Sequence, residues 1–477
     1  MSAEKFYITT PIYYVNDKPH IGSAYTTIVA DTFARWRRQQ GKDVLFLTGV
    51  DEYAQKTVDA AKKTGEEIVA YTNRMAKEWE SAWEKLRISN TDFIRTTEDR
   101  HIKTVHDFWE RLRAADDIYM GRYEGLYCKG CEEFKKEKDL IDGLCPIHKT
   151  EPEQVSEENY FFRLSKYQKQ LLEFYEAHGD FVAPANRFQE VKSFVEAGLE
   201  DISFSREKRA WGIPVPNDLH QVIYVWADAL VNYISAVGIE GWEEHPADIH
   251  TVGKDILRFH AVIWPAMLMA AGLPLPGQII ANGFLTVDGV KISKSLGNAI
   301  DPLELAERYG VDAVRYFLLR EVPFGADGDF SEEKMKERYN ADLANGLGNF
   351  AARVLALAEK ETLVLGLLDS EFEKQIAVMK IAVAKKTGEF KFNEALMAIW
   401  DVLAFGDYYM NEKKVWAITD DVARRSAIFN CVTLLDNVAA ALMSFLPETS
   451  KKITSVIRWE GKTFHAKKID VLFPRMK

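Results

Sequence analysis

Residues 6–52 carry the pattern that most constrains the fold of this chain. Residues 6–10 are rich in β-forming side chains, and Pro11 is expected to end that strand. Apolar residues then recur at helical spacing over 25–36, before a short apolar run at 44–47. A strand, a helix and a strand in this order form a βαβ unit, which predicts a doubly wound parallel sheet of the nucleotide-binding type.

Polar side chains follow the predicted strands. Tyr14, His20 and Asp51 come just after two strand ends, and Asp255 follows a third short strand pattern. In doubly wound folds ligands bind beyond the C-terminal ends of the strands, so we expect a site at this edge. For Asp51 alone, ordinary turn chemistry is an equally good interpretation.

His20 stands directly before the predicted helix, in the run Pro19-His20-Ile21-Gly22-Ser23. A helix N-terminus offers free N–H groups and partial positive charge to a phosphate. Gly22 permits close approach of a nucleotide, and the imidazole can donate to phosphate oxygens. Catalysis of this kind is mainly positioning and charge stabilisation, and no Gly-x-Ser-x-Gly elbow is placed for a covalent nucleophile.

A second basic motif reads Lys291-Ile292-Ser293-Lys294-Ser295 and follows a predicted Asp288-Gly289 turn. Two ammonium groups three residues apart, with Gly297 beyond them, suit a mobile loop that grips phosphates. Most Lys-Ser runs are only solvated loops. The presence of His20 upstream favours the phosphate-binding interpretation.

Three of the four cysteines cluster within one short segment. The pattern Cys-x2-Cys-x13-Cys-x2-His, formed by Cys128, Cys131, Cys145 and His148, has the spacing of a tetrahedral zinc knuckle. Four protein ligands close the site, so the metal is expected to be structural. The alternative is reduced, unliganded cysteines at a surface turn.

Aromatic residues mark a possible pocket. The run 224–229 is predicted to be a central strand entering a helix, on which Trp226, Ala229 and Tyr233 share one face. His260 and Trp264 are four residues apart on a later helix. Together with Ile263 they would suit a linear, uncharged, polarisable side chain, although core packing is the default interpretation of aromatics at this spacing.

The chain is long enough for several domains, with 477 residues of which 47% are hydrophobic. Its net charge of −11 argues against non-specific nucleic-acid binding as the main role, without excluding a local basic face. No apolar run reaches the ~18 residues of a membrane span. Nothing at the N-terminus resembles a signal peptide, and the clustered cysteines fit a reducing compartment, so we expect a cytoplasmic protein.

These motifs together resemble a known family. His-Ile-Gly-Ser at 20–23 and Lys-Ile-Ser-Lys-Ser at 291–295 resemble the HIGH and KMSKS signatures of class I aminoacyl-tRNA synthetases. Ser23 replaces the second His, and a hydroxyl can bind a phosphate but cannot become cationic. With the knuckle and the motifs Gly-Val-Asp-Glu (49–52), Val-Trp-Ala-Asp-Ala (225–229) and Gly-Lys-Asp-Ile (253–256), nearly the whole chain is similar to the methionyl-tRNA synthetases in their bacterial short form.

The resemblance implies roles for individual residues. Asp51 would hold the methionine ammonium group, in a pocket lined by Ile12, Tyr14, Trp226, Ala229, Tyr233, His260 and Trp264. ATP with Mg²⁺ would be handled by His20, Gly22, Ser23, Asp255, Lys291 and Lys294, of which His20, Lys291 and Lys294 would be catalytic. Two departures bear on the pocket: the family's usual Asp-Glu-His-Gly reads Asp-Glu-Tyr-Ala at 51–54, and Ile263 stands where an aromatic is frequent.

The resemblance also implies domain boundaries. It predicts a Rossmann half (1–115), a connective insertion (116–225) with the knuckle at 128–148, a second Rossmann half (226–290), the KMSKS loop with a stem-contact fold (291–340) and an α-helical anticodon-binding domain (341–477). In the last domain Asn349 and Arg353 are spaced i, i+4, and Trp416 lies near a helix end. The matching positions of the family read the CAU anticodon by stacking and hydrogen bonding. Without the family, a surface pair and a core Trp are the simpler interpretation.

The expected function is therefore a two-step ligase that forms methionyl-adenylate and charges initiator and elongator tRNA(Met). Some members carry a further dimerisation domain, for which the chain leaves no room after residue 477, so we expect a monomer. The nearest alternative is another class I synthetase. Those for isoleucine, leucine and valine carry a large editing insert, and the cysteine enzyme uses an active-site zinc. A non-catalytic tRNA-binding paralogue is a third possibility.

Overall fold

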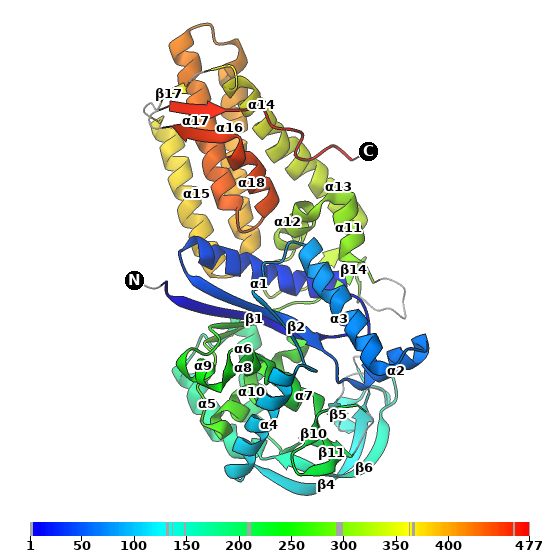
Figure 1. The fold of residues 1–477 in the computed structure, drawn as a ribbon. Helices are drawn as coiled ribbons and strands as arrows, with labels where there is room; N and C mark the ends of the chain where they lie inside the picture. The colour runs from blue at the N-terminus through cyan, green and yellow to red at the C-terminus, as the bar shows by residue number, and fades with distance from the viewer. Residues whose placement is uncertain are drawn as a thin grey trace. The chain divides into compact units, whose positions relative to one another are not determined.

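The computed structural model describes residues 3–129, 133–135, 137–146, 149–207, 211–291, 299–361, 363–364, 368–460 and 463–476. The contacts within the chain divide it into two units (Figure 1). Unit 1 comprises the residues up to Pro19 together with Gly41–Asn282. Unit 2 comprises His20–Gln40 together with the chain from Gly283 onward. The helix that follows the first strand therefore groups with the C-terminal half of the sequence.

Unit 1 is built on a parallel sheet. In the part of the chain that the structure describes, its six strands run in the order β3-β2-β1-β12-β13-β7. Their bounds are β1 (Lys5–Tyr14), β2 (Asp43–Asp51), β3 (Asp92–Arg95), β7 (Val182–Ala183), β12 (Ile249–Gly253) and β13 (Gln278–Asn282). The order reverses at β1, which lies between β2 and β12, and this is the topological switch point of a doubly wound sheet. The predicted doubly wound parallel sheet is confirmed.

The first strand is longer than its sequence predicts. Strand β1 continues through Pro11 to Tyr14, so the expectation that Pro11 ends it is wrong. Pairing with β2 shifts register between Thr9 and Ile12, so the proline occupies an irregularity of the ladder. A residue without an N–H is tolerated at such a bulge because no ladder hydrogen bond is required of it there.

Nine helices are described in unit 1. They are α2 (Gln55–Thr64), α3 (Ile68–Lys85), α4 (Asp99–Ala114), α5 (Gln168–Ala177), α6 (Ala185–Glu196), α7 (Val225–Ala229), α8 (Asn232–Ser235), α9 (Gly238–Glu244) and α10 (Trp264–Ala271). The segment 54–115, read from sequence as helical throughout, also contains the edge strand β3. Only four residues long, β3 is too short to show a strand period among charged helices.

Two antiparallel sheets lie between β3 and β12 in the chain. One has the order β5-β4-β6-β8, with β4 (Ile118–Cys128), β5 (Glu133–Lys135), β6 (Glu153–Phe162) and β8 (Ile202–Ser203). The other has the order β10-β11-β9, with β9 (Ser205–Glu207), β10 (Pro214–Val215) and β11 (Asp218–Ile223). The prediction of a central strand at 224–229 is wrong. The strand is β11 of this side sheet, and residues from Val225 are already helical, because an apolar run this short does not separate the two states.

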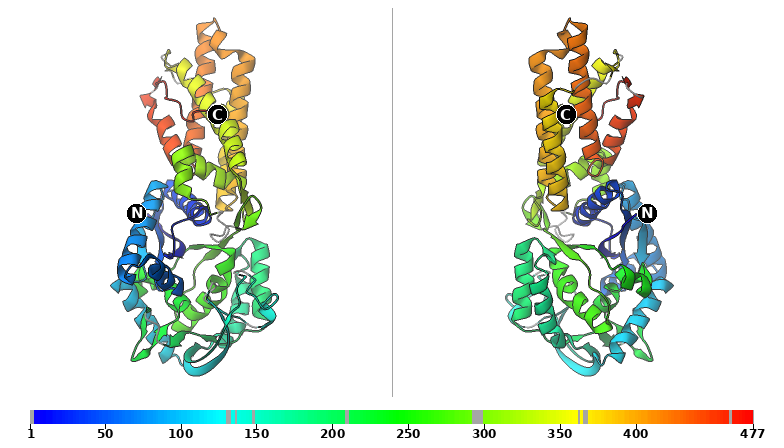
Figure 2. Two further views of the ribbon diagram at one scale, coloured as in Figure 1. Left: turned by 90° about the vertical axis from the view of Figure 1, so that its right-hand side faces the viewer. Right: turned by 90° about the vertical axis from the view of Figure 1, so that its left-hand side faces the viewer.

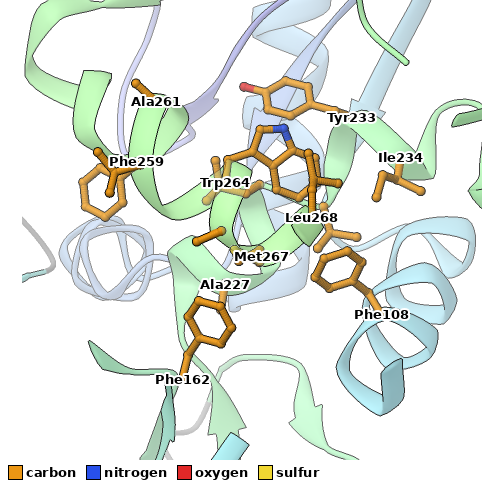
Figure 3. Packing of buried hydrophobic residues seen from close by; sticks show 14 of the residues in the cluster. Phe108, Phe162, Ala227, Tyr233, Ile234, Phe259, Ala261, Trp264, Met267 and Leu268 are labelled. Atoms are coloured by element: carbon orange, nitrogen blue, oxygen red, sulfur yellow. The ribbon is translucent and has the colours of Figure 1, made fainter. Parts of the chain in front are cut away.

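The hydrophobic core of unit 1 lies among α4, α7, α8 and α10. Figure 3 shows the Trp264 indole between Tyr233 and Leu268, with Phe108 of α4 nearby. Trp264 and Tyr233 are almost completely buried. The residues predicted to form an aromatic pocket therefore come from the core, as the default interpretation also held.

Unit 2 is mainly helical. Its described α-helices are α1 (Ile21–Gln39), α11 (Pro302–Tyr309), α12 (Val311–Glu321), α13 (Glu332–Arg338), α14 (Asn349–Ala358), α15 (Ser370–Gly388), α16 (Phe392–Lys413), α17 (Asp421–Leu442) and α18 (Pro447–Ser455). The long helices α15, α16 and α17 run side by side (Figures 1 and 2). Among the described residues of either unit, no helix combines the length and apolar character needed to cross a bilayer.

Unit 2 also contains two small sheets. One has the order β15-β14-β16, with β14 (Leu285–Val287), β15 (Val290–Lys291) and β16 (Gly328–Phe330). The other has the order β17-β19-β18, with β17 (Leu363–Val364), β18 (Ile457–Glu460) and β19 (Thr463–Ala466). The chain beyond 341 is mainly helical as predicted, and the three short strands of the second sheet also lie in it.

A buried ion pair joins α1 to α12 within unit 2. Nη1 of Arg315 lies 2.7 Å from Oδ2 of Asp31, and both side chains are fully buried. The same guanidinium donates through Nε to the carbonyl of Phe445 at 2.8 Å. Removing one partner of a buried pair leaves an uncompensated charge, so α1 is held firmly in this unit.

Candidate active site

The parallel strands of unit 1 end in polar residues at one edge of the sheet. Tyr14 and Asp51 are the last residues of β1 and β2, and they are register partners. Asp51 is buried. Asp255 lies in a short helical turn directly after β12, whose last residue is Gly253. Three of the four side chains expected just past strand ends are therefore carried by three strands of this edge, and the fourth, His20, belongs to unit 2.

The segment after β2 is fixed by a dense set of contacts around Glu52. Its carboxylate is buried and receives Nη2 of Arg95 at 2.7 Å together with the hydroxyl of Thr97. Its N–H donates to the Thr96 hydroxyl at 3.0 Å, and its carbonyl accepts from the Trp211 indole at 2.6 Å. The carboxylate, N–H and carbonyl of Glu52 all make hydrogen bonds, so the backbone position of the neighbouring Asp51 is fixed as well.

Aromatic rings from three segments meet in the core of unit 1. The Tyr233 hydroxyl and Nε2 of His260 are 2.7 Å apart, and the Tyr233 ring lies 6.0 Å from that of Trp264. Trp226 lies 6.3 Å from the His260 ring in an edge-to-face arrangement. The structure therefore brings together four of the predicted pocket residues.

The hydrogen bonds of this cluster define its protonation. Nδ1 of His260 lies 3.0 Å from the carbonyl of Ile256, which can only accept, so Nδ1 carries the proton. Nε2 is then an acceptor, and the Tyr233 hydroxyl donates to it. Burial lowers the pKa of His260 to about 4, and burial together with His260 lowers the pKa of His250 well below its usual value. The cluster is consequently uncharged at neutral pH.

A local helix irregularity places His260 and Trp264. Residues Phe259–Ile263 form a π-helical turn, and α10 begins at Trp264 with Pro265 next. Because Pro265 has no N–H, the carbonyl of Ala261 loses its usual helical donor. The Tyr175 hydroxyl replaces that donor at 2.6 Å. Single π-turns of this kind are frequent at functional sites.

The remaining predicted pocket residues differ in exposure. Ala229 is buried, and its carbonyl accepts from the Asn232 amide at 2.6 Å. Ile12 and Tyr14 are partly buried and pack against the core of unit 1. The Lys56 ammonium lies 5.2 Å from the centre of the Tyr14 ring.

His20 of unit 2 caps helix α1. Its Nδ1 accepts the N–H of Gly22 at 3.1 Å and that of Ser23 at 3.4 Å, so the ring proton resides on Nε2. Ser23 completes a capping box, since its hydroxyl accepts the His20 N–H at 3.0 Å and donates to the His20 carbonyl. A Cβ at Gly22 would lie 3.0 Å from the His20 ring, so a glycine keeps this cap close. Burial lowers the pKa of His20.

The hairpin β14–β15 leads into the second basic motif. Asp288 and Gly289 both have positive φ, at 51° and 75°, which confirms the predicted Asp-Gly turn. The Asp329 carboxylate accepts from the Gly289 N–H at 2.7 Å and from the Thr286 hydroxyl at 2.6 Å. These hydrogen bonds lower the pKa of Asp329. Lys291 ends β15, and Lys294 lies outside the described residues.

Comparisons with known proteins agree on one family. The family model for class I tRNA synthetases (M) matches residues 6–151 and 135–355. The methionine–tRNA ligase of Thermotoga maritima is 44% identical, covering 96% of this chain and 76% of its own, and that of Streptomyces coelicolor is 46% identical, covering 94% and 89%. A solved structure of Mycobacterium tuberculosis methionyl-tRNA synthetase in complex with methionyl-adenylate superposes with a TM-score of 0.94 at 38% identity, over 99% of this chain and 100% of that one. The chain belongs to the class I methionyl-tRNA synthetases.

Only part of the zinc knuckle expected of a methionyl-tRNA synthetase lies within the described residues. Cys128 ends β4 and Cys145 lies beyond β5, and both side chains are buried. Cys131 and His148 lie outside the described residues, and within them no group of three or more ligands comes together. The Lys149 N–H donates to the Cys145 carbonyl at 2.8 Å. Two buried soft ligands fit a zinc site.

The three residues expected to read an anticodon lie in unit 2. Asn349 begins α14 and is exposed, and Arg353 follows one turn later. The Arg353 guanidinium lies 5.4 Å from the Trp416 ring and donates to Asp407 at 2.6 Å and to Asn411 at 2.7 Å. Trp416 is 52% exposed, so the simpler interpretation of a core Trp does not hold. The structure brings Arg353 and Trp416 together at a surface.

Sequence reasoning missed several residues of the site. Phe259 stacks on Trp226 with ring centres 3.9 Å apart, and His250 lies 4.2 Å from the Tyr233 ring. Trp211 binds the carbonyl of Glu52 across 159 residues. Phe259 stands next to His260 in the sequence and was within reach of motif reasoning, whereas Trp211 carries no local signal.

Proposed function

We propose that this chain is a methionine–tRNA ligase. The methionine carboxylate attacks the α-phosphate of ATP, pyrophosphate leaves, and the resulting methionyl-adenylate passes the methionyl group to a hydroxyl of the terminal adenosine of tRNA(Met), releasing AMP. The observation that carries this proposal is the uncharged aromatic cluster around the Tyr233–His260 hydrogen bond in a member of the methionyl family.

Methionine binding is assigned to unit 1. Asp51 holds the ammonium group, and Ile12, Tyr14, Trp226, Ala229, Tyr233, His260 and Trp264 surround the side chain. A thioether is a weak acceptor with a polarisable sulfur, so it is best served by aromatic faces and few charges. The neutral His260 and its hydroxyl partner supply such a surface, because a cationic imidazole would call for an anion.

ATP handling is assigned chiefly to residues of unit 2. His20 has Nδ1 engaged by backbone N–H groups, which leaves Nε2–H to donate to a phosphate oxygen. Lys291 and Lys294 stabilise the charge that develops during attack, and Asp255 of unit 1 acts near the ribose or the amino acid. Gly22 admits the nucleotide, and Ser23 supports the cap of α1. Mg²⁺ accompanies ATP as the counterion of its phosphates.

Recognition of tRNA(Met), initiator and elongator alike, is assigned to Asn349, Arg353 and Trp416. A half-exposed indole beside a guanidinium provides a stacking surface and hydrogen-bond donors for an unstacked base. Asp407 and Asn411 fix the direction of the guanidinium.

A structural zinc ion is proposed at Cys128, Cys131, Cys145 and His148. Three thiolates and one imidazole fill a tetrahedral shell and leave no position for a substrate. Atomic emission analysis of the purified chain should find one zinc per chain. Cys145→Ser should lower that content and the stability of the β4–β6 region, and an unchanged zinc content would contradict the assignment.

ATP–pyrophosphate exchange with each amino acid in turn tests the function. We expect exchange with methionine alone. Exchange with isoleucine, leucine, valine or cysteine would favour another class I synthetase, and no exchange would favour a non-catalytic tRNA-binding protein. Lys294→Ala should slow adenylate formation by ~10²-fold or more while methionine binding is nearly kept, as expected for loss of a charge contact made in the transition state.

Cytoplasmic localisation and a monomeric state complete the proposal. Charging of tRNA for translation suits the cytoplasm, and the clustered cysteines of the predicted knuckle fit a reducing compartment. Light scattering of the purified chain tests the monomer, and a mass near twice 54.4 kDa would contradict it.

A further inference from the structure

A histidine to which the proposed reaction gives no role lies on a central strand of unit 1. His250 is fully buried on β12, which pairs with β1 on one side and with β13 on the other. Strands in such a position normally carry apolar side chains on both faces. A buried imidazole there is costly unless its ring nitrogens have hydrogen-bond partners, so those partners indicate what the residue is for.

Both ring nitrogens of His250 have a partner. Nδ1 lies 2.7 Å from the hydroxyl of Thr9, and Nε2 lies 3.3 Å from the indole Nε1 of Trp264. An indole nitrogen can only donate, so Nε2 is the acceptor in a neutral ring, and Nδ1 carries the proton that is donated to Thr9. Burial, with His260 nearby, lowers the pKa of His250 well below its usual value, so this neutral form persists at neutral pH.

The same imidazole meets three of the residues that we assign to the methionine pocket. Besides the hydrogen bond from Trp264, its ring centre lies 4.2 Å from that of Tyr233 and 6.3 Å from that of His260. Tyr233 and Trp264 are themselves neighbours, as Figure 3 shows, with ring centres 6.0 Å apart. His250 therefore contacts the pocket residues from the side of the sheet.

The hydrogen bond to His250 determines which way the indole of Trp264 points. That side chain is fully buried and has a single polar atom. If the ring turned over, its N–H would lose the acceptor in a buried site, and an unsatisfied buried donor is costly. Tyr233 is held by other groups as well, since its hydroxyl pairs with His260 and its carbonyl accepts the Tyr7 hydroxyl at 2.8 Å.

His250 is itself held rigidly. Its strand is paired on both sides, and Thr9 is its register partner on β1. The ring of Trp242 on α9 lies 6.2 Å away and nearly parallel, at 13°. A group that orients another side chain must have its own position fixed by packing and hydrogen bonds, and His250 meets this requirement.

We propose that His250 is a positioning residue for methionine recognition, which orients the indole of Trp264 through Nε2 and supports the ring of Tyr233. The inference rests on the proposed function, in which these two residues surround the methionine side chain. His250 acts through Trp264 and does not touch the substrate, because both of its ring nitrogens are already engaged by the protein.

This role concerns binding of the amino acid and not the chemical step. A pocket wall that is already oriented costs less conformational entropy when the ligand arrives. If the indole were free to turn, methionine would have to order it, so the affinity for methionine would fall. The residues assigned to ATP would be unaffected, and the change should appear in the KM for methionine with kcat unchanged.

ATP–pyrophosphate exchange by the full chain, with methionine as the varied substrate, tests the inference. Asparagine places its amide where Nδ1 of the imidazole stands, so His250→Asn keeps a contact with Thr9 and cannot reach Trp264. We expect the KM for methionine to rise about tenfold, as for the loss of one buried hydrogen bond, with kcat and the KM for ATP within about twofold. The amide of His250→Gln extends to the place of Nε2 and should restore most of the affinity.

A spectroscopic measurement follows the contact without any substrate. In a TROSY spectrum of the isotope-labelled full chain, the indole N–H signal of Trp264 is assigned by its disappearance in Trp264→Phe. This signal should move in His250→Asn and return toward its original position in His250→Gln. An unmoved signal in His250→Asn would overturn the inference.

A second buried histidine of unit 1 provides a matched control. His101 on α4 is also fully buried, and its Nδ1 lies 3.0 Å from the hydroxyl of Ser235, which is outside the assigned pocket. His101→Asn should lower the stability of the chain as His250→Asn does, but it should leave the KM for methionine unchanged. An equal rise in KM for both variants would show a general loosening of unit 1 and overturn the inference.

Thr9→Val is a milder change that keeps the inference testable if His250→Asn does not fold. It removes one hydroxyl at nearly constant shape, so the Nδ1 proton of His250 loses its acceptor. The ring then favours the tautomer with the proton on Nε2, which sets two donors against each other at Trp264. The KM for methionine should rise in Thr9→Val and stay unchanged in Thr9→Ser.

The outcomes also distinguish this inference from the proposed function. An unchanged KM for methionine in both His250→Asn and Thr9→Val, with methionine-dependent exchange intact, overturns the role of His250 alone. A fall in kcat without a change in KM does the same. If methionine does not support exchange by the unaltered chain, the proposed function and the inference fall together.

Discussion

The aromatic cluster of unit 1, which is the predicted pocket, and the Arg353–Trp416 surface of unit 2 use similar side chains in opposite settings. In the pocket Tyr233, His260 and Trp264 are buried and uncharged, and a buried hydroxyl–imidazole hydrogen bond joins two of them. At the surface a half-exposed indole lies beside a guanidinium whose partners are a carboxylate and an amide. The comparison teaches that a buried aromatic cluster is inseparable from stability, whereas an exposed aromatic pair can be altered with little effect on folding.

The largest expected difference in stability comes from removing a tryptophan from the buried cluster and one from the exposed surface. Trp264→Ala should lower the free energy of unfolding by about 3–5 kcal/mol, because a buried aromatic leaves a large cavity. Trp416→Ala should change it by less than about 0.5 kcal/mol. Denaturant unfolding followed by far-UV circular dichroism measures both, with Trp264→Phe as the graded control. Equal losses for the two tryptophans would contradict the comparison.

Acid should affect the pocket next most strongly. His260 has a pKa of about 4 in the folded chain and His101 one of about 3, both below the ~6.5 of an unfolded histidine. The unfolded state therefore takes up protons first, and stability falls as pH drops below ~6.5. From pH 7 to pH 5 each histidine costs about 2 kcal/mol.

Stability profiles of His260→Asn and of the unaltered chain check this prediction. The variant should lose less stability between pH 7 and pH 5. His465→Gln, at an exposed histidine of unit 2, serves as the control and should follow the unaltered chain. Parallel profiles for all three chains would refute it.

Substitution of Trp416 should lower the rate of tRNA charging although it leaves stability nearly unchanged. Trp416→Ala should reduce kcat/KM for tRNA charging by a factor equivalent to about 1–3 kcal/mol, the usual value of one stacked base. Methionine-dependent ATP–pyrophosphate exchange, which needs no tRNA, should stay within twofold. Steady-state charging and exchange assays on the same preparation separate the two, and a matched fall in exchange would argue against an anticodon role.

The smallest expected difference in stability is between the loss of one buried hydrogen bond and the loss of one partly exposed ion pair. Tyr233→Phe leaves Nε2 of His260 without its donor in a buried site, which should cost about 1–3 kcal/mol of stability. Asp407→Asn weakens a partly exposed ion pair with Arg353, which should cost about 0–1 kcal/mol. Urea midpoints at constant slope measure both, and a larger loss for Asp407→Asn would reverse the ranking of the two sites.

Short sequence patterns correctly predicted those features that depend only on residues close together in the sequence. The βαβ order, the position of Asp51 at the end of β2 and the Asp288-Gly289 turn all follow from periodicity and turn chemistry within a few residues. The resemblance to the methionyl family supplied the pocket residues, and the structure gathers four of them into one cluster.

Features that depend on distant partners could not be predicted. Strand β1 passes through Pro11 only because β2 accommodates a register shift there, and the sequence around Pro11 does not show it. The contact between Trp211 and Glu52, and the approach of His101 to Asp228, join segments that share no motif. The Tyr175 hydroxyl that serves the carbonyl of Ala261 is another case.

The ion pair between Asp31 and Arg315 has a consequence for how the polypeptide is made. During synthesis, Thr32 of α1 emerges 283 residues before Arg315, the residue whose guanidinium it and Asp31 meet in the folded protein. In the nascent chain, α1 therefore lacks its partner in α12 until most of the chain has been translated. No single cut yields unit 2, since a fragment starting at Gly283 would bury the Arg315 guanidinium without its counter-charge.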